Sequence, residues 1–130
     1  MNEPSFLSLE EVLGIHRQQL DLWGGSDGVL NENTLLAALG QAAAVFSFVD
    51  DADLYDMAAA YAFSISEGQP FVDGNKRTGL NAALLFLDLN SAALPDDRGQ
   101  LYAAMMQVAN GELTRAGLAD VLRSGSIRDR

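Results

Sequence analysis

Two neighbouring cations stand at the start of a predicted helix, in the segment QPFVDGNKRTGL (residues 69–80). Lys76 and Arg77 lie where the aligned peptide dipoles of a helix carry partial positive charge, and each costs about 0.3–1 kcal/mol there unless a negative charge is near. Gly74 directly precedes this turn and permits backbone conformations that other residues avoid. The free N–H groups of a first helical turn bind anions. A bound anion would make the two cations its counter-charges, and phosphate fits best because Arg holds it through two parallel hydrogen bonds.

Two more residues of this segment bear on such a site. Asp73 adds a carboxylate, which beside a phosphate either binds Mg²⁺ or orients a basic side chain. Asn75 is a favoured N-cap residue, so the helix is expected to begin there. An Asp-Gly turn, an Asn cap and two solvated cations also occur in helices that have no function. The residues alone therefore leave open both a phosphate site and a purely structural helix start.

The elements that must position these residues all read as helices, and no segment alternates as a strand does. The first helix opens with a capping box formed by Ser8 and Glu11. The fourth is apolar almost all round over residues 82–87, as in a helix surrounded by others. The predicted helices cover residues 8–23, about 33–44, 51 or 53 to 68, about 75–90, about 97–110, and 114 to about 123.

These elements predict an all-α protein, a compact bundle of about six helices around a central helix at about residues 75–90. No linker or internal repeat divides the chain, so we expect one domain over residues 1–124 and a flexible tail at 125–130. The size of 130 residues, 48% of them hydrophobic, suits a single globular core.

The composition also limits the possible functions. The formal net charge of −10 argues against nucleic-acid binding, which needs a basic face to displace phosphate counterions. The longest apolar run, residues 82–87, is far short of the ~20 residues that span a bilayer. The first eleven residues have no apolar stretch of the kind found in secretory signals, and the chain has no cysteine. We therefore expect a cytoplasmic protein that binds neither membranes nor nucleic acids.

His16 is the sole histidine of the chain. It falls in a predicted helical stripe with Leu9, Leu13, Leu20 and Trp23, which indicates a packed and hydrogen-bonded structural residue. If an imidazole assists any catalysis in this protein, it has to be His16.

The segment PFVDGNKRTGLNAALLFLDLN (residues 70–90) resembles the signature of the Fic/Doc family, whose core motif reads His-Pro-Phe-x-Asp-(Gly/Ala)-Asn-(Gly/Lys)-Arg. Lys76, in the place of glycine, is similar to the Doc (death-on-curing) branch. Residues 15–39, 53–65 and 109–122 also resemble that branch, so the likeness covers nearly the whole chain. The resemblance implies the all-α Fic fold.

By this resemblance, residues 74–77 (Gly74, Asn75, Lys76 and Arg77) would bind the phosphates of ATP. Asp73 would take the acidic position associated with Mg²⁺ and phosphate, and Phe71 would anchor the loop in the core. Fic proteins typically transfer AMP to a protein hydroxyl, whereas Doc proteins use ATP in the reverse orientation and transfer its γ-phosphoryl group. Lys76 favours the second reaction, because it fills room that glycine leaves.

The Doc resemblance also implies partners. Doc proteins are toxins that phosphorylate a translation elongation factor, and a paired antitoxin silences them by docking a helix into a surface groove. We therefore expect an exposed apolar groove in this protein.

One departure from the motif concerns its catalytic histidine, whose position is occupied by Gln69, next to Gly68 in the place of the usual asparagine. A glutamine amide forms hydrogen bonds but has no useful basicity near neutral pH. Loss of a general base typically costs ~10²–10⁴-fold in rate. Gln69 can reflect a natural loss of activity, a deliberate substitution, or a retuned site. A weakened transferase and an inactive nucleotide- or partner-binding protein are thus both compatible with the sequence, and AMP transfer is a narrower alternative.

Overall fold

The computed structural model describes residues 2–127, which form six α-helices joined by loops. Within this range the backbone contains no named strand, and one isolated antiparallel bridge joins Val29 to Phe71. The predicted all-α fold is therefore confirmed. The helices are α1 (Leu9–Trp23), α2 (Glu32–Phe48), α3 (Leu54–Gly68), α4 (Asn75–Leu89), α5 (Arg98–Ala109) and α6 (Arg115–Ile127).

Local capping fixes most of the helix starts. Ser8 and Glu11 form the predicted capping box of α1, and Asp53 and Asp56 form a second one at α3. Each pair satisfies two backbone N–H groups that the helix itself leaves unpaired. Asn31 caps α2 and Asp97 caps α5 through their side chains; these caps explain why four of the six helices begin where they do.

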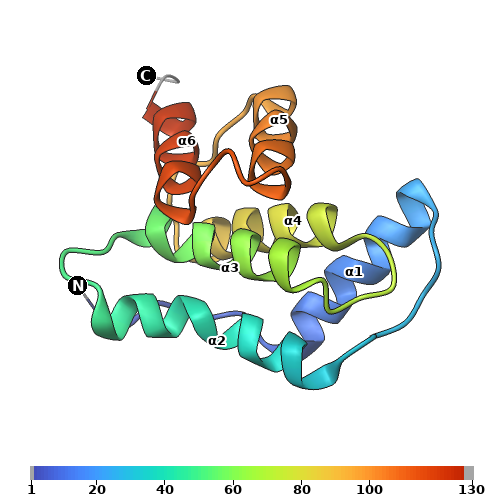
Figure 1. The fold of residues 1–130 in the computed structure, drawn as a ribbon. Helices are drawn as coiled ribbons and strands as arrows, with labels where there is room; N and C mark the ends of the chain where they lie inside the picture. Colours follow the sequence, from blue (N-terminus) through green and yellow to red (C-terminus); the bar gives the residue numbers. More distant parts are fainter. Residues whose placement is uncertain (1, 128–130) are drawn as a thin grey trace.

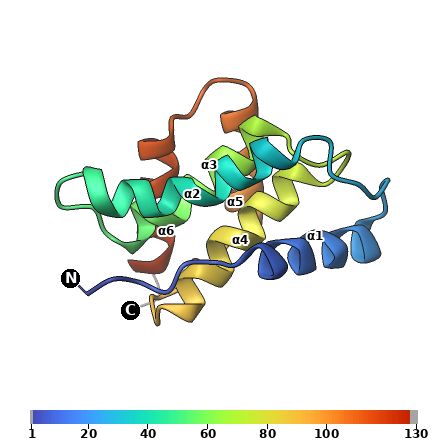
Figure 2. The same cartoon turned by 90° about the horizontal axis from the view of Figure 1, so that it is seen from below.

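The core lies between α3 and α4, which pack more extensively against each other than any other pair. Figure 1 shows α5 and α6 on one side of this pair and α2 on the other, and Figure 2 shows α1 running beside α4. Residues 57–62 of α3 are all buried, and four of these six are alanine. Such small side chains let neighbouring helices approach closely. Gly79 of α4 lies so close to α3 that a Cβ built there would be 2.8 Å from the carbonyl oxygen of Ala62.

Three boundaries or faces differ from the sequence-based expectation. The helix predicted over 33–44 runs to Phe48, because Val45 continues the buried face begun by Leu35, Ala38 and Ala42 at spacings of three and four. The sixth helix continues past its expected end near 123 to Ile127, so the tail predicted at 125–130 is helical as far as it is described; residues 128–130 lie outside the described part.

The buried face of α1 was also predicted incorrectly. Leu13 and Trp23 of the expected apolar stripe are 37% and 59% exposed. The helix instead buries a face that turns His16 and Gln19 toward the α3–α4 loop, so part of its apolar set stays at the surface. The buried residues of α1 are Val12, Ile15, His16 and Gln19.

The described chain contains no helix with the length and apolar character that crossing a bilayer requires.

Candidate functional site

The site is built on the loop between α3 and α4, residues 69–74. Two residues of this loop have a left-handed backbone: Gln69 at φ 49° and ψ 55°, and Gly74 at φ 81° and ψ 17°. Gly74 adopts that conformation without steric cost, whereas a non-glycine residue such as Gln69 pays for it. Strained backbone of this kind concentrates at functional positions.

Asn75 does not cap α4 as predicted. Gly74 occupies the N-cap position, and Asn75 is the first residue of the helix. The Asn75 side chain reaches back across the loop, accepting a hydrogen bond from the Phe71 amide and donating one to the Phe71 carbonyl, each of 3.0 Å. An amide side chain offers both groups at once, so it ties off the loop backbone in a way that a capping oxygen would not.

His16 and Phe71 support the loop from its buried side. Phe71 is fully buried in the core, and the His16 ring stacks on it with a centroid separation of 3.8 Å and an interplanar angle of 10°. His16 Nε2 donates a hydrogen bond of 2.8 Å to the Asp73 carbonyl, so this nitrogen carries the proton. The imidazole is buried and engaged with the loop backbone, which fits the structural role predicted for His16 better than the catalytic one.

The α1–α2 connection holds the outer side of the loop, an arrangement that the sequence did not reveal. The Val72 amide donates to the Gly28 carbonyl at 3.0 Å, and the Leu30 amide donates to the Pro70 carbonyl at 2.7 Å. In addition, the Ser26 amide donates to Asp73 Oδ2 at 2.8 Å. Both Figure 1 and Figure 2 show this connection passing beside the α3–α4 loop. Elements far apart in the sequence therefore fix the loop before any ligand arrives.

The first turn of α4 presents backbone donors without acceptors. Along this turn, Thr78 is the first residue whose amide has an acceptor: it donates to the Gly74 carbonyl at 2.9 Å. No side chain caps the helix, and among the described residues the N–H groups of Asn75, Lys76 and Arg77 have no acceptor. Unpaired donors combined with the helix dipole form an anion site.

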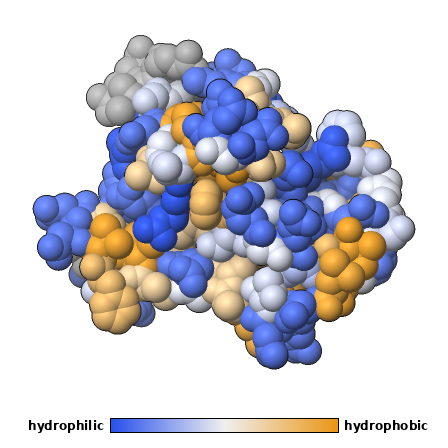
Figure 3. All heavy atoms as spheres, viewed as in Figure 1, coloured by the Kyte–Doolittle hydropathy of each residue, from blue (hydrophilic) through white to orange (hydrophobic). Residues whose placement is uncertain are grey.

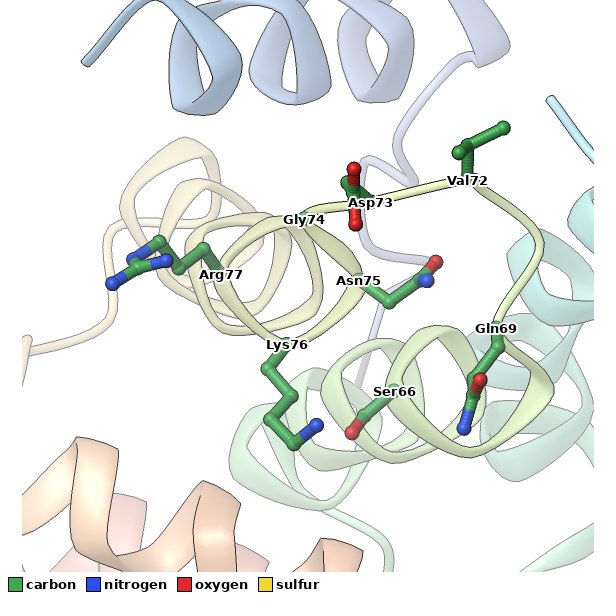
Figure 4. A pocket seen from close by; sticks show the side chains of 8 residues that line it. All are labelled: Ser66, Gln69, Val72, Asp73, Gly74, Asn75, Lys76 and Arg77. Carbon is green, nitrogen blue, oxygen red and sulfur yellow. The ribbon is translucent and has the colours of Figure 1, made fainter. Parts of the chain in front are cut away.

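A cavity of about 310 Å³ opens in front of these donors. Ser66 of α3 lies on its wall, and the sequence did not single this residue out. Ser66 is 3% exposed, and its Oγ has no hydrogen-bond partner in the described structure. Figure 4 shows the side chains of Ser66, Gln69 and Lys76 on one side of the loop. The lining residues are Ser66, Gln69, Val72, Asp73, Gly74, Asn75, Lys76 and Arg77.

Arg77 does not face the cavity beside Lys76, although the sequence predicted that both cations would be counter-charges of one anion. Figure 4 shows its side chain directed away from Lys76. Its guanidinium carbon lies 4.7 Å from the centroid of the Trp23 ring and 5.8 Å from that of Tyr102. Both distances are within the range of cation–π attraction. Lys76 is therefore the cation that faces the cavity together with Ser66 and Gln69, while Arg77 lines its far edge.

Asp73 is the acidic residue of the cavity. The described residues contain no cluster of three or more His, Asp or Glu side chains that would enclose a metal ion. Mg²⁺ does not require one, because it is usually bound by one or two carboxylates and the phosphates of the substrate. The Ser26 amide binds Oδ2 and orients the Asp73 carboxylate. A single oriented carboxylate beside phosphate donors therefore fits a phosphate-bound Mg²⁺.

Comparisons with known proteins identify the family of the chain. A family model described as the Fic/DOC family matches residues 6–87, a range that includes α1, the α3–α4 loop and most of α4. Among characterised proteins, the chain is similar to "Protein kinase doc" of Escherichia phage P1. The two are 32% identical over 117 residues, which cover 90% of this chain and 92% of the phage protein.

Proposed function

The chain belongs to the Fic/Doc family, and we propose that it binds the phosphates of ATP at the start of α4 and that Gln69 has weakened its Doc-like transfer of a phosphoryl group to a protein hydroxyl. The observation that carries this proposal is the set of unpaired amides at residues 75–77 in front of the cavity. Lys76 and the unpaired Ser66 hydroxyl add two further donors on the same side. The number and charge of these donors suit the oxygens of a polyphosphate.

The proposed reaction relies on positioning. Phosphoryl transfer has a loose transition state, in which alignment and charge stabilisation dominate. The helix amides and Lys76 would bind the transferred group, and Asp73 would hold Mg²⁺, which neutralises charge on the phosphates when bound. Gln69 is exposed at the cavity and can orient an attacking hydroxyl through its amide. It cannot accept the hydroxyl proton, so transfer is slow.

Two alternatives differ from this proposal in their chemistry. Nucleotide binding without turnover is favoured by the lack of histidine among the residues that line the cavity. AMP transfer is disfavoured because Lys76 occupies room beside the loop that glycine would leave open.

The partners belong to the same proposal. A Doc-like toxin would act on a translation elongation factor and be silenced by an antitoxin helix. In support, an apolar cavity of about 190 Å³ lies between α1 and α2, lined by Leu9, Leu13, Val29, Glu32 and Leu35. Leu30, in the connection between these helices, and Leu36 of α2 are also exposed. The face drawn in Figure 3 is mainly hydrophilic, with separate apolar patches of the kind that a helix can cover.

Restoring a general base at residue 69 tests the proposal. Gln69→His should raise the transfer of label from γ-labelled ATP to proteins of a bacterial extract by about 10²–10⁴-fold, because a positioned imidazole supplies the missing general base. Labelling from α-labelled ATP should stay at background, since the phosphoryl group and not AMP is transferred. The matched control is Gln69→Asn, which tolerates the left-handed backbone but adds no base.

The results separate the alternatives. If Gln69→His transfers more γ-label than the unmodified protein and Gln69→Asn does not, the protein is a disabled kinase. Expression of the Gln69→His protein should then also arrest bacterial growth. Transfer of the α-label would assign AMP transfer instead. If Gln69→His binds ATP and transfers neither label, the protein is a binding module and the proposal of phosphoryl transfer is wrong.

A further inference from the structure

We propose that Trp23 and Tyr102 form a stacking subsite for the purine ring of the nucleotide whose phosphates bind at the start of α4. This subsite rests on the proposed function and extends it, since nothing in the phosphate site itself identifies the rest of the ligand. Trp23 ends α1 and Tyr102 lies in α5, so the tertiary fold alone brings the two rings to the same guanidinium.

The first observation is the exposure of Trp23. Trp23 is 59% exposed, an unusually high value for such a large aromatic residue. Arg77 lies 4.7 Å from its ring centroid and holds it next to the anion cavity. Aromatic side chains exposed beside a cationic surface serve as platforms on which nucleobases stack, because every base has a π-face.

The second observation is a row of three cavities in which neighbours share lining residues. A cavity of about 230 Å³ is lined by Trp23 and also by Asp73, Gly74 and Arg77, all three of which line the anion cavity. A further cavity of about 360 Å³ shares Gln19 and Trp23 with it and is also lined by Tyr102. An extended ligand can therefore keep its phosphates at the helix start and reach the two rings.

The third observation is the mixed lining of that last cavity, which is mainly apolar and includes Leu22 but also presents several polar groups. Besides the aromatic rings it is lined by three amide side chains, Gln18, Gln19 and Asn81, and by the cationic Arg98. Amides offer both donors and acceptors, as the edge of a purine base requires. Arg98 and Arg77 place positive charge at this end of an otherwise acidic protein, which suits a nucleotide rather than an acidic protein segment that would need a larger basic face.

The subsite also defines the direction of the ligand. With the base at Trp23, the phosphate chain runs past Arg77 and Gly74 toward Ser66 and Gln69. The terminal phosphate is then the group nearest Gln69. This direction agrees with transfer of the γ-phosphoryl group, since the phosphate next to the ribose would lie farther from the acceptor.

Trp23 is the sole tryptophan of the chain, so its fluorescence tests the subsite directly. ATP should change the intensity of Trp23 emission upon binding, whereas inorganic triphosphate should bind, as measured by calorimetry, and leave the emission nearly unchanged. Trp23→Leu should weaken ATP binding by about tenfold, because base stacking on an aromatic ring is lost. Trp23→Phe should retain most of the ATP affinity, and both variants should bind inorganic triphosphate as the unmodified protein does.

Other outcomes overturn the inference. Equal affinities of the unmodified and Trp23→Leu proteins for ATP would reject the subsite while leaving the phosphate site intact. A parallel loss of ATP and triphosphate binding in Trp23→Leu would show that Trp23 acts only by holding Arg77. If neither ligand binds the unmodified protein, the proposed function fails and the subsite fails with it. Tyr102→Ala should lower ATP affinity in the same selective way, and a lack of effect would remove Tyr102 from the proposal.

Discussion

The Ser66 hydroxyl carries a cost that a bound ligand would remove. It is buried in the wall of the anion cavity and has no hydrogen-bond partner in the described structure. An unsatisfied buried polar group of this kind costs about 1–3 kcal/mol. A phosphate oxygen bound at the start of α4 would accept a hydrogen bond from Ser66 and remove that cost.

Ser66→Ala should therefore change stability and binding in opposite directions. Without ligand the variant should be more stable in denaturant unfolding, because the unsatisfied hydroxyl is gone. Its affinity for inorganic triphosphate should fall by about tenfold, as expected when a hydrogen bond to a charged group is lost. Ser64→Ala, on the same helix but outside the cavity lining, is the control: it should show only the small gain in stability that helix propensity gives, less than Ser66→Ala, and should leave triphosphate affinity unchanged. Unchanged triphosphate affinity in Ser66→Ala would exclude the hydroxyl from the anion site.

For single residues, the sequence predicted which positions of the loop matter better than it predicted the contacts that their side chains make. Gly74 and Lys76 lie where the charge argument placed them, because a helix start is a local feature. The roles of Asn75 and Arg77 differ, since Asn75 ties the loop to Phe71 and Arg77 turns to Trp23. Ser66 carries no sequence signal at all, because a serine in an apolar helix looks the same with or without a ligand.

Among the elements, the crossing of α3 and α4 positions both walls of the cavity. Ser66 lies near the end of α3, and the anion donors lie in the first turn of α4. Where Gly79 faces the backbone of Ala62, the two helices leave no room for a side chain. Any change that separates them should also widen the cavity.

Gly79→Ala should destabilise the protein by about 1–3 kcal/mol, because the new methyl group overlaps a backbone oxygen that cannot move aside. The midpoint of urea unfolding measures this change. The matched control is Gly14→Ala in α1, where a Cβ meets nothing within 4 Å. That variant should gain up to about 1 kcal/mol from helix propensity. Equal shifts for the two variants would mean that the α3–α4 contact is looser than described.

The helices themselves were largely predictable, since capping residues and periodicity act over a few residues. The N-cap of α3 at Asp53 and its end at Gly68 agree with the helix predicted from 51 or 53 to 68. The buried face of α1 was not predictable in the same way. Which residues of α1 are buried depends on its packing against α4 and the α3–α4 loop, and the hydrophobic pattern alone points to Leu13 and Trp23.

Across the whole molecule, Arg123 of α6 connects the last helix to the start of α3. It donates hydrogen bonds to Asp53 at 2.8 and 2.9 Å, and its nitrogens also pair with Asp56 and Asp120. Burial of Asp53 raises its pKa. Hydrogen bonds from Arg123 and from the Asp56 backbone, together with the charge of Arg123, outweigh this effect, so the pKa of Asp53 lies below its ordinary value of 3.8. The hydrogen bond to Asp53 likewise raises the pKa of Arg123.

A lowered folded-state pKa gives Asp53 a stabilising effect that is complete above its ordinary pKa and is lost as the pH falls through the lowered value. Asp53→Asn keeps an N-cap side chain but removes this charge. Thermal unfolding followed by circular dichroism should therefore show a smaller loss of Tm for Asp53→Asn than for the unmodified protein as the pH falls below about 4. Asp27→Asn, in the more exposed pair with Arg17, is the control and should follow the unmodified protein. Identical acid profiles for all three proteins would contradict a role of Asp53.

The central claim is that the first turn of α4 binds a phosphate anion, and amide NMR tests it most directly. Titration of ¹⁵N-labelled protein with inorganic triphosphate should shift the amide resonances of Asn75, Lys76 and Arg77, because their N–H groups gain an acceptor. The first turn of α5 is the internal control, since Asp97 already accepts from the Gln100 amide, and its resonances should not move. Saturable shifts at residues 75–77, with none in the first turn of α5, are the predicted result, and unmoved resonances at residues 75–77 under millimolar triphosphate would contradict the claim.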